Sequence, residues 1–317
     1  MRAIQVTEFG GPEVLVSTDV PEPVPGPGEA VVQVSYADII FLDTTLRGGA
    51  GQEYFPLRPP YVPGGAIAGT VAAVGAGVDP GLIGRSVASR TKNWGGYAEK
   101  ALVDAAILVE VPVGLDERDA ASLLHDGLTA YALREKVGIH EGETVLVVAA
   151  AGGLGILLVQ LARNAGAHVI GAARGAAKLE MVTKWGAGAA VDYSEPGWTD
   201  HLDQPAVVFD GAGGPLGQAA FEIVAAGGRF SAHGTPAGSF TAADPERARE
   251  RNITLTGIAE AQVTAAEAVR FTKRALADAA AGLITPVVGQ VYALDDVAQA
   301  HRALQERTNV GKVLLRI

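Results

Sequence analysis

The sequence predicts an α/β protein in which a mostly β domain is joined to a doubly wound parallel-sheet domain. Two observations lead to this fold class. Short β-like runs separated by turn-forming residues fill the first part of the chain, and from residue 116 onward apolar strands alternate with helices. Strands that are apolar along their whole length are typical of a parallel sheet covered by helices on both faces. The length of 317 residues also favours two domains.

The β-like runs of the N-terminal part are short and irregularly spaced. They are EAVVQVSYADI (29–39), IAGTVAAVGAGV (67–78), SVASR (86–90) and AILVEVP (106–112). Stretches rich in proline and glycine separate them and indicate turns. The segment RGGAGQEYFPLRPPYVPGG (47–65) has no regular period, and its length is typical of a functional loop.

The second part of the chain begins with a helical pattern over residues 116–138. The strands expected after it cover residues 143–151, 168–174, 189–193, 205–211, 228–234 and, at one edge, 252–258. Helical stretches lie between them, and the chain ends with helical patterns over 264–282 and 292–306 and a strand over 311–317. We expect this last strand to return to the N-terminal domain. The predicted domains are therefore residues 1–116 plus 286–317, and residues 117–285.

Composition narrows the possible functions. Lysine and arginine number 25 against 35 aspartates and glutamates, and a net charge of −10 opposes non-specific binding to nucleic acid. There is no cysteine, which excludes disulfides and thiolate zinc sites. The N-terminus lacks the apolar segment of a signal peptide, and glycines interrupt the apolar run 145–162. We expect a cytoplasmic protein with no membrane span.

A small-residue turn joins the first apolar strand of the second domain to the next helix. Ala151, Gly152, Gly153, Leu154 and Gly155 form it, and Ala150 stands at the place of the first glycine of a dinucleotide-binding fingerprint. Glycines here allow the backbone to approach a pyrophosphate, and the helix N-terminus offers it free N–H groups. The turn therefore predicts a nucleotide cofactor in a Rossmann-type domain.

The next strand ends on Arg174, where an NAD-binding domain has a carboxylate that binds the ribose hydroxyls. Arginine instead offers a fixed charge and a planar set of donors to a 2′-phosphate, and Lys178 could add a second charge. The pattern predicts NADPH as the cofactor. The alternative, that both side chains are solvated surface cations, stays open.

The chain resembles the medium-chain dehydrogenase/reductase superfamily, specifically its zinc-independent, zeta-crystallin-like quinone oxidoreductase branch. The resemblance covers essentially the whole chain and is carried by PYVPGGAIAGTVAAVGAGV, GGYAEKALV, the long stretch from GLTAYALREKVG to HVIGAAR, GAGAAVDY and AHRALQERTNVGKVLL. It implies a GroES-like first domain, a Rossmann-type second domain and an active site in the cleft between them. It also implies a homodimer that pairs the edge strands of the cofactor sheets, with NITLTGI (252–258) as the candidate edge.

The resemblance also assigns further cofactor residues. Lys178 and Tyr193 match positions that contact the adenosine phosphate, and Thr129 matches a threonine near the nicotinamide. The loops that pass the nicotinamide contain Gly211, Gly213, His233, Gly234 and Thr235, and the C-terminal segment that closes over the cofactor contains Asn309 and Gly311. For the loop residues, plain turn formation is the alternative.

No metal is expected. Where zinc-dependent members carry a GHE motif, this chain reads PGGAIAG, with Ala66 and Ile67 in place of the histidine and glutamate. The six histidines, at 125, 140, 168, 201, 233 and 301, show no ligand spacing.

The substrate side departs from the branch. Ile40 replaces an asparagine, Asp43 matches, and Phe55 replaces a tyrosine, with Tyr54 beside it. With Tyr61, these residues suggest a rather apolar pocket for a flat acceptor.

Three residues are candidates for a catalytic role: His125, Tyr54 and Thr129. His125 could donate to a substrate oxygen or protonate an enolate. The alternative for His125 is a packed residue at a helix end, and Asp126 is expected to cap the next helix. Asp38 could replace some of the polarity lost from the pocket, but we expect it to be an exposed strand end.

The leading prediction is an NADPH-dependent reductase that transfers hydride to a quinone or an activated alkene, because without zinc the acceptor must already be electron-poor. The first alternative is a biosynthetic enoyl reductase of polyketide type. The second is a non-catalytic NADPH-binding protein.

Overall fold

The computed structural model describes residues 1–260 and 262–317. It divides into two compact units, of which the first combines residues 1–128 with 265–317 and the second covers 129–264. The second unit is thus inserted into the first, as the returning C-terminal segment predicts. The first unit contains the predicted mostly β domain, and the second contains the predicted parallel sheet.

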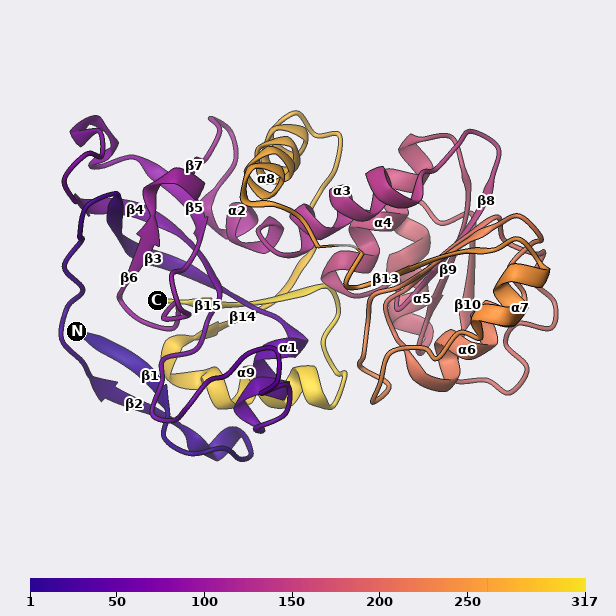
Figure 1. The fold of residues 1–317 in the computed structure, drawn as a ribbon, viewed down its shortest axis with the longest axis horizontal. Helices are drawn as coiled ribbons and strands as arrows, with labels where there is room; N and C mark the ends of the chain where they lie inside the picture. The colour runs from indigo at the N-terminus through magenta and orange to yellow at the C-terminus, as the bar shows by residue number, and fades with distance from the viewer. Residues whose placement is uncertain (261) are drawn as a thin grey trace. The chain divides into compact units, whose positions relative to one another are not determined.

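The first unit is built on a sheet of seven strands in the order β14-β15-β3-β4-β5-β7, with β6 paired to β3. These strands are β3 (Glu29–Ile39), β4 (Ala66–Val74), β5 (Ser86–Arg90), β6 (Lys100–Asp104), β7 (Val109–Glu110), β14 (Val288–Ala293) and β15 (Lys312–Arg316). A separate two-stranded sheet pairs β1 (Arg2–Val6) with β2 (Leu15–Asp19). In Figure 1 the yellow β15 lies beside the much earlier β3, with which it pairs antiparallel.

Short helices accompany this sheet. The α-helices are α1 (Phe41–Arg47), α2 (Glu117–Leu123), α8 (Ala265–Ala280) and α9 (Val297–Gln305), and the 3₁₀ turns are Pro12–Val14, Pro80–Leu82, Ala105–Ile107 and Leu294–Asp296. Helix α3 (Asp126–Val137) begins in the first unit and continues into the second.

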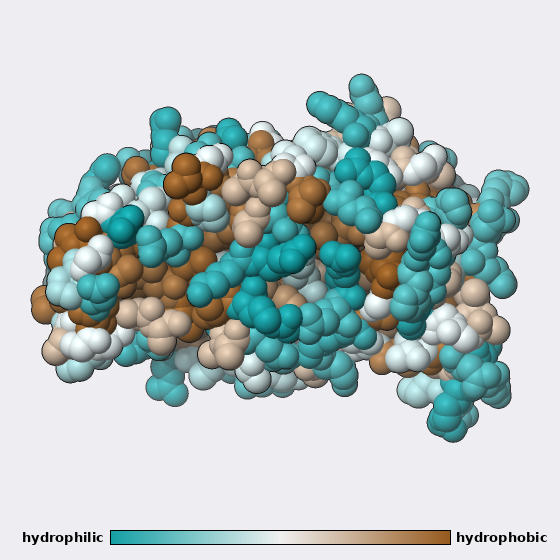
Figure 2. Space-filling model, turned by 90° about the horizontal axis from the view of Figure 1, so that it is seen from above, coloured by the Kyte–Doolittle hydropathy of each residue, from teal (hydrophilic) through white to brown (hydrophobic). Residues whose placement is uncertain are grey.

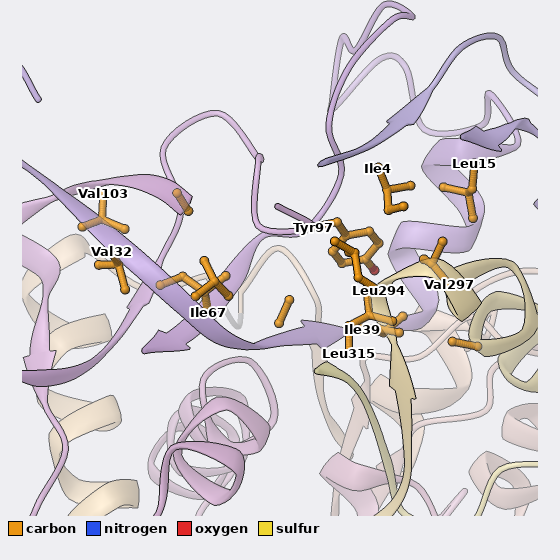
Figure 3. Close-up of a cluster of buried hydrophobic side chains, with 14 of the residues drawn as sticks. Ile4, Leu15, Val32, Ile39, Ile67, Tyr97, Val103, Leu294, Val297 and Leu315 are labelled. Atoms are coloured by element: carbon orange, nitrogen blue, oxygen red, sulfur yellow. The ribbon is translucent and has the colours of Figure 1, made fainter. Parts of the chain in front are cut away.

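The core of the first unit is formed by the sheet, the N-terminal strands and α9. Figure 3 shows Ile4, Ile39, Leu294 and Leu315 grouped around Tyr97, and all five side chains are buried. Residues from both ends of the sequence therefore complete one core.

The second unit contains a six-stranded, all-parallel sheet in the order β10-β9-β8-β11-β12-β13. Its strands are β8 (Thr144–Val148), β9 (His168–Ala173), β10 (Ala189–Asp192), β11 (Val207–Asp210), β12 (Arg229–Ala232) and β13 (Thr254–Gly257). Its helices are α4 (Gly153–Asn164), α5 (Ala176–Lys184), α6 (Gly214–Glu222) and α7 (Pro245–Glu250). The strand order reverses direction between β8 and β11, and such a switch point is where open α/β sheets bind their ligands.

The observed boundaries differ from the predicted ones. We expected residues 117–285 to form the second domain, but α2 and α8 both belong to the first unit. The reason is packing: α2 lies against β3, β4 and β5, and α8 lies against α2. Strand β13 stands at the edge of its sheet, as predicted.

Candidate active site

The turn between β8 and α4 has the geometry of a phosphate-binding turn. Ala149 adopts a left-handed conformation with φ of 62°, and Gly152 is the N-cap of α4 with φ of −80° and no side chain to cap it. The sequence suggested that Ala150 would take over the role of the first fingerprint glycine. The sharp bend lies one residue earlier, at Ala149, while Ala150 is fully buried.

The two fingerprint glycines, Gly152 and Gly155, have different structural roles. A Cβ on Gly155 would lie 2.4 Å from the carbonyl oxygen of Ala149, so only glycine lets α4 approach the turn this closely. A Cβ on Gly152 would meet only that same oxygen, at 3.5 Å, so the protein itself leaves open space there. That open space in front of an uncapped helix N-terminus fits a pyrophosphate.

Arg174 follows the last residue of β9, and its side chain is exposed. The next residue, Gly175, has φ of 78° and is the N-cap of α5, which places Lys178 in the first turn of that helix. The carboxyl ends of β8 and β9 lie at the same edge of the parallel sheet. Arg174 is therefore at the same edge as the Gly152–Gly155 turn, where a 2′-phosphate is expected.

Tyr193 follows β10 at this edge and stacks edge-on against Trp198, with ring centroids 6.5 Å apart. The preceding carboxylate, Asp192, accepts hydrogen bonds from the Gly175 and Ser194 backbone N–H groups at 2.8 and 2.9 Å. Burial opposes the charge of Asp192, but the hydrogen bonds from Ser194 and Gly175 and the charge of Arg174 leave its pKa below the ordinary value. Asp192 thus shapes the turn that carries Arg174.

The predicted nicotinamide loops follow β11 and β12 and touch each other. A Cβ on Gly234 would lie 2.0 Å from the carbonyl oxygen of Gly211, so both loops depend on glycine for this approach. Buried Asp210 organises the first loop by accepting the N–H groups of Ala212 and Gly213 at 3.0 and 2.9 Å.

His233 lies in the second loop, followed by Gly234 and the half-buried Thr235. Burial lowers the pKa of His233 to about 4, so its imidazole is neutral at pH 7.

A second set of polar residues gathers in the first unit, where it extends from β3 to the break between α2 and α3. His125 lies in that break, and its Nδ1 is 2.8 Å from Oδ2 of Asp38. Lys312 of β15 forms an ion pair with Oδ1 of Asp38 and lies 3.1 Å from Oδ2 of Asp126. Asp38 is only 1% exposed, so the expectation that it is an exposed strand end is wrong. It is buried because β15 and α2 cover the end of β3.

The charges of this network support one another. Burial opposes the ionised form of Asp38, yet the Lys312 ammonium and the hydrogen bond from His125 hold its pKa below the usual value. Burial also opposes the charge of Lys312, but the carboxylates of Asp126 and Asp38 raise its pKa above the usual value. Burial raises the pKa of Asp126. Asp126 was expected to cap α3, and in the structure its carboxylate pairs with Lys312.

A second buried network lies in the first unit around Tyr97. The Tyr97 hydroxyl donates to Oδ2 of Asp43 at 3.2 Å and lies 3.3 Å from Nε2 of His301, whose Nδ1 is 3.1 Å from the guanidinium of Arg47. Arginine can only donate, so Nδ1 of His301 is unprotonated, and burial lowers the pKa of His301 to about 3. Burial raises the pKa of Asp43 to about 6.

The predicted substrate residues are spread over the first unit. Asp43 is 2% exposed and holds the start of α1 by accepting the N–H of Ile40 at 2.9 Å, so it lies in the core rather than at a surface. Burial also raises the pKa of half-buried Tyr61, to about 12. Phe55 contacts Trp94 edge-on, with centroids 6.1 Å apart, while Tyr54 is 76% exposed.

The last three predicted residues make few contacts that identify a role. Thr129 is half-buried on α3. The Asn309 side chain donates to the carbonyl oxygen of Gly311 at 3.1 Å, which fixes the turn before β15. Gly311 needs its left-handed φ of 72° there.

Sequence reasoning missed Lys312, Gly65 and Trp94. Lys312 was visible only as part of the GKVLL ending, and its partner Asp38 is far away in the sequence. Gly65 and Trp94 lie beside His125: a Cβ on Gly65 would be 3.3 Å from Cε1 of His125 and 3.3 Å from Cζ3 of Trp94. Nothing in the local pattern indicated this contact.

Other features were searched across residues 1–260 and 262–317. In that part of the chain, no three His, Cys, Asp or Glu side chains gather closely enough to bind a metal ion. None of its helices is both long and apolar enough to cross a bilayer. Figure 2 shows hydrophobic residues exposed among hydrophilic ones on the face seen from above. A groove of about 420 Å³ in the first unit, lined by Leu82, Leu108, Pro112 and Leu276, contains none of the predicted site residues.

Comparison with known proteins places the chain in a family. The alcohol dehydrogenase GroES-like domain matches residues 26–113, and the zinc-binding dehydrogenase domain matches residues 153–274. The quinone oxidoreductase of Pseudomonas aeruginosa is 31% identical over 330 residues, which cover 99% of each chain. The chain belongs to the zinc-independent quinone oxidoreductase branch of the medium-chain dehydrogenase/reductase superfamily.

Two further relatives define the range of this branch. The 2-haloacrylate reductase of Burkholderia is 30% identical over 331 residues, covering 99% of this chain and 98% of the relative. A mycobacterial protein solved in complex with NADPH is 33% identical, with a TM-score of 0.91 and full coverage of both chains. The chain is thus similar both to proteins named for quinones and to a protein named for a haloacrylate.

Proposed function

We propose that this chain is an NADPH-dependent reductase that transfers hydride to a quinone or to an alkene activated by a carbonyl group. The observation that carries the proposal is the sheet edge of the second unit, where an uncapped helix N-terminus with open space at Gly152 lies at the same edge as exposed Arg174. The helix end suits a pyrophosphate, and the guanidinium suits a 2′-phosphate. The NADPH complex of the mycobacterial relative supports the same cofactor.

NADPH supplies the hydride, while the protein orients the acceptor and delivers the proton. A quinone and an alkene conjugated to a carbonyl both accept hydride without a metal, because their carbonyl groups take up the negative charge. The relatives named for quinones support the first class, and the 2-haloacrylate reductase supports the second. A dedicated enoyl reductase would use the same chemistry, and turnover of enones without turnover of quinones would identify it.

The test is steady-state oxidation of NADPH and of NADH by a panel of quinones and conjugated enones. We expect NADPH to be preferred because Arg174 pairs with the phosphate that NADH lacks. Replacing Arg174 by alanine removes a charge-assisted contact worth about 1.5–3 kcal/mol, so NADPH affinity should fall roughly 10- to 100-fold while NADH affinity stays unchanged.

Titration calorimetry measures both affinities, and Arg249→Ala, which removes an exposed arginine on α7, is the control. A preference for NADH, or equal losses for both cofactors, would contradict the assignment of Arg174.

We also propose that two copies of the chain associate through β13, the edge strand of the cofactor sheet. The support is that β13 has β12 as its neighbour on one side and ends the sheet on the other. An unpaired strand edge is a ready template for pairing with a second chain.

A further inference from the structure

The interaction between His125 and Asp38 fixes which nitrogen of the imidazole can exchange a proton. Asp38 is a carboxylate and can only accept, so Nδ1 of His125, at 2.8 Å, carries a hydrogen. Nε2 is therefore the atom that gains or loses a proton. The same arrangement, a carboxylate that orients a histidine through one nitrogen and leaves the other free to react, is a general way of building an acid–base group.

Lys312 keeps Asp38 in the charged form. Asp38 is paired with Leu314 across the β3–β15 ladder, and Lys312 stands two residues before Leu314 on the same face of β15. The register of the two strands therefore places the Lys312 ammonium diagonally opposite the Asp38 carboxylate, in a site where both are almost fully buried. A buried charge of this kind persists only when it is paired.

The Nε2 edge of the imidazole lies close to Gly65, where a side chain would crowd it. A Cβ on Gly65 would lie 3.4 Å from Nε2 of His125 and 3.3 Å from the indole of Trp94. The segment around Gly65 is held firmly, because the N–H groups of Thr91 and Gly96 donate to the carbonyl oxygens of Gly65 and Gly64. The His125 side chain is 27% exposed.

Two aromatic side chains, Trp94 and Phe55, lie near Gly65 and His125. Trp94 has φ of 68°, a left-handed conformation that is costly for a non-glycine residue and tends to occur at functional sites. Phe55 packs edge-on against Trp94. Flat, partly aromatic molecules pack well against such rings.

We propose that His125 donates its Nε2 proton to the carbonyl oxygen of a conjugated, flat acceptor seated against Trp94 at Gly65, with Asp38 as its positioning residue. This inference rests on the proposed function. Hydride from NADPH forms a C–H bond at the β-carbon of the acceptor, and the electron pair of the C=C bond moves through the conjugated system onto the carbonyl oxygen. That oxygen then forms an O–H bond while the Nε2–H bond breaks, and the bonding pair stays on the neutral imidazole. The enol becomes the saturated ketone in water, and His125 regains its proton from solvent.

Four charged or titratable groups act on His125: Asp38 at Nδ1, Asp126 and Lys312 of the same ion network, and Asp43 in the neighbouring network. Asp38, Asp43 and Lys312 are buried, whereas His125 is partly exposed.

The first test compares His125→Gln with wild type in NADPH-dependent reduction of an aryl enone. We expect kcat to fall about 100-fold or more, with little change in the KM for NADPH. His201→Gln, which alters an exposed histidine of the second unit, should behave as wild type. If His125→Gln keeps kcat within twofold of wild type, the proposal is overturned.

The second test leaves the imidazole in place and narrows the space beside it. Gly65→Ala should raise the KM for the aryl enone at least tenfold, whereas Gly188→Ala, where a Cβ would find its nearest neighbour at 3.8 Å, should have no effect. An unchanged KM in Gly65→Ala would show that the acceptor binds elsewhere.

The third test needs no turnover. Nitrogen-15 NMR of labelled holoenzyme should show Nδ1 of His125 protonated in wild type, and Asp38→Asn should shift the proton distribution toward Nε2. If the enzyme oxidises NADPH with no acceptor, the proposed function fails, yet the NMR result still decides whether Asp38 positions the imidazole. A wild-type imidazole with its proton on Nε2 would overturn the inference while the reductase function stands.

Discussion

Two buried aspartates near the end of β3 show how single partners decide the state of an ionisable residue. Asp38 and Asp43 are 1% and 2% exposed, so burial penalises the charge of both. Asp38 forms an ion pair with Lys312, and its pKa is lowered. Asp43 receives hydrogen bonds from the Ile40 N–H and the Tyr97 hydroxyl but no ion pair is formed with it among the described residues, and burial raises its pKa to about 6. A nearby cation outweighs desolvation, whereas neutral donors do not.

The raised pKa of Asp43 predicts that the protein loses stability as pH rises. Below about pH 3.8 the carboxyl is protonated in both folded and unfolded states, and between 3.8 and about 6 only the folded state keeps the proton. The contribution of Asp43 is therefore greatest at low pH and falls by about 3 kcal/mol as pH increases through this window. The amide introduced by Asp43→Asn does not titrate, so this variant should be more stable than wild type above pH 6.

The measurement is urea unfolding of wild type and Asp43→Asn from pH 4 to pH 8. The informative quantity is the difference between their free energies of unfolding, because other titrating groups cancel in it. Between pH 4 and pH 6, the free energy of unfolding of Asp43→Asn should rise relative to that of wild type. A difference independent of pH would mean that folding does not change the pKa of Asp43.

At the scale of residues, sequence patterns located titratable groups but not their partners. His125 and Arg174 were identified from their positions relative to helix and strand ends. Asp38 was misplaced because Ala37, Asp38 and Ile39 are all buried, which breaks the alternation expected of a half-exposed strand. The residue that explains this burial, Lys312, meets Asp38 only through the pairing of β15 with β3. Pairing between segments so distant in sequence leaves no local signal.

At the scale of elements, two glycines of the β8–α4 turn have different roles: Gly155 is needed for folding, and Gly152 is needed for cofactor binding. Gly155→Ala would place a Cβ 2.4 Å from the Ala149 carbonyl and should cost about 1–3 kcal/mol of stability through overpacking. Gly152→Ala has a permitted φ and open space, so stability should change by less than about 0.5 kcal/mol. The added methyl group would instead occupy the approach of the pyrophosphate, and NADPH affinity should fall about tenfold or more.

Chemical denaturation and calorimetric titration of NADPH, performed on both variants, test this separation directly. We expect Gly155→Ala to lose stability and Gly152→Ala to lose affinity for NADPH. Equal affinity of Gly152→Ala and wild type for NADPH would place the pyrophosphate somewhere other than this helix end.

The elements themselves were largely predictable, because apolar strands and amphipathic helices leave strong patterns. Each expected strand of the cofactor domain has a counterpart, from β8 to β13. Two details were not predictable. The helical stretch 116–138 is two helices with a break at Leu124 and His125, and the bend before α4 falls on Ala149. Both depend on packing against other elements rather than on local preference.

At the scale of the whole molecule, pairing of β13 edges predicts a dimer in solution. Light scattering should give a mass of twice 32.4 kDa for wild type. Thr254→Lys adds a charge to an exposed residue of the edge strand, where it would face the same strand of the second copy, so the variant should be a monomer. Ala242→Lys adds the same charge at an exposed loop position and should remain a dimer. A monomeric wild type, or a dimeric Thr254→Lys, would contradict edge pairing.

The insertion of one unit into the other was predictable from the sequence, because the pattern returns from helix to strand at the C-terminus. The boundaries were not, since α2 and α8 carry helical patterns that match neighbours in either unit. The unit to which α2 or α8 belongs depends on the apolar surface against which that helix packs.

The place of β15 in its sheet also sets an order of events during synthesis. The second unit is one continuous segment, 129–264, and can fold as soon as it has left the ribosome. The first unit cannot complete its fold at that stage. Its strand β15 lies between β14 and β3 and is translated after every other strand of that sheet. Until then β3 has an open edge and Asp38 has no lysine. At that stage every strand of the second unit has been translated, while the sheet of the first unit still lacks β15.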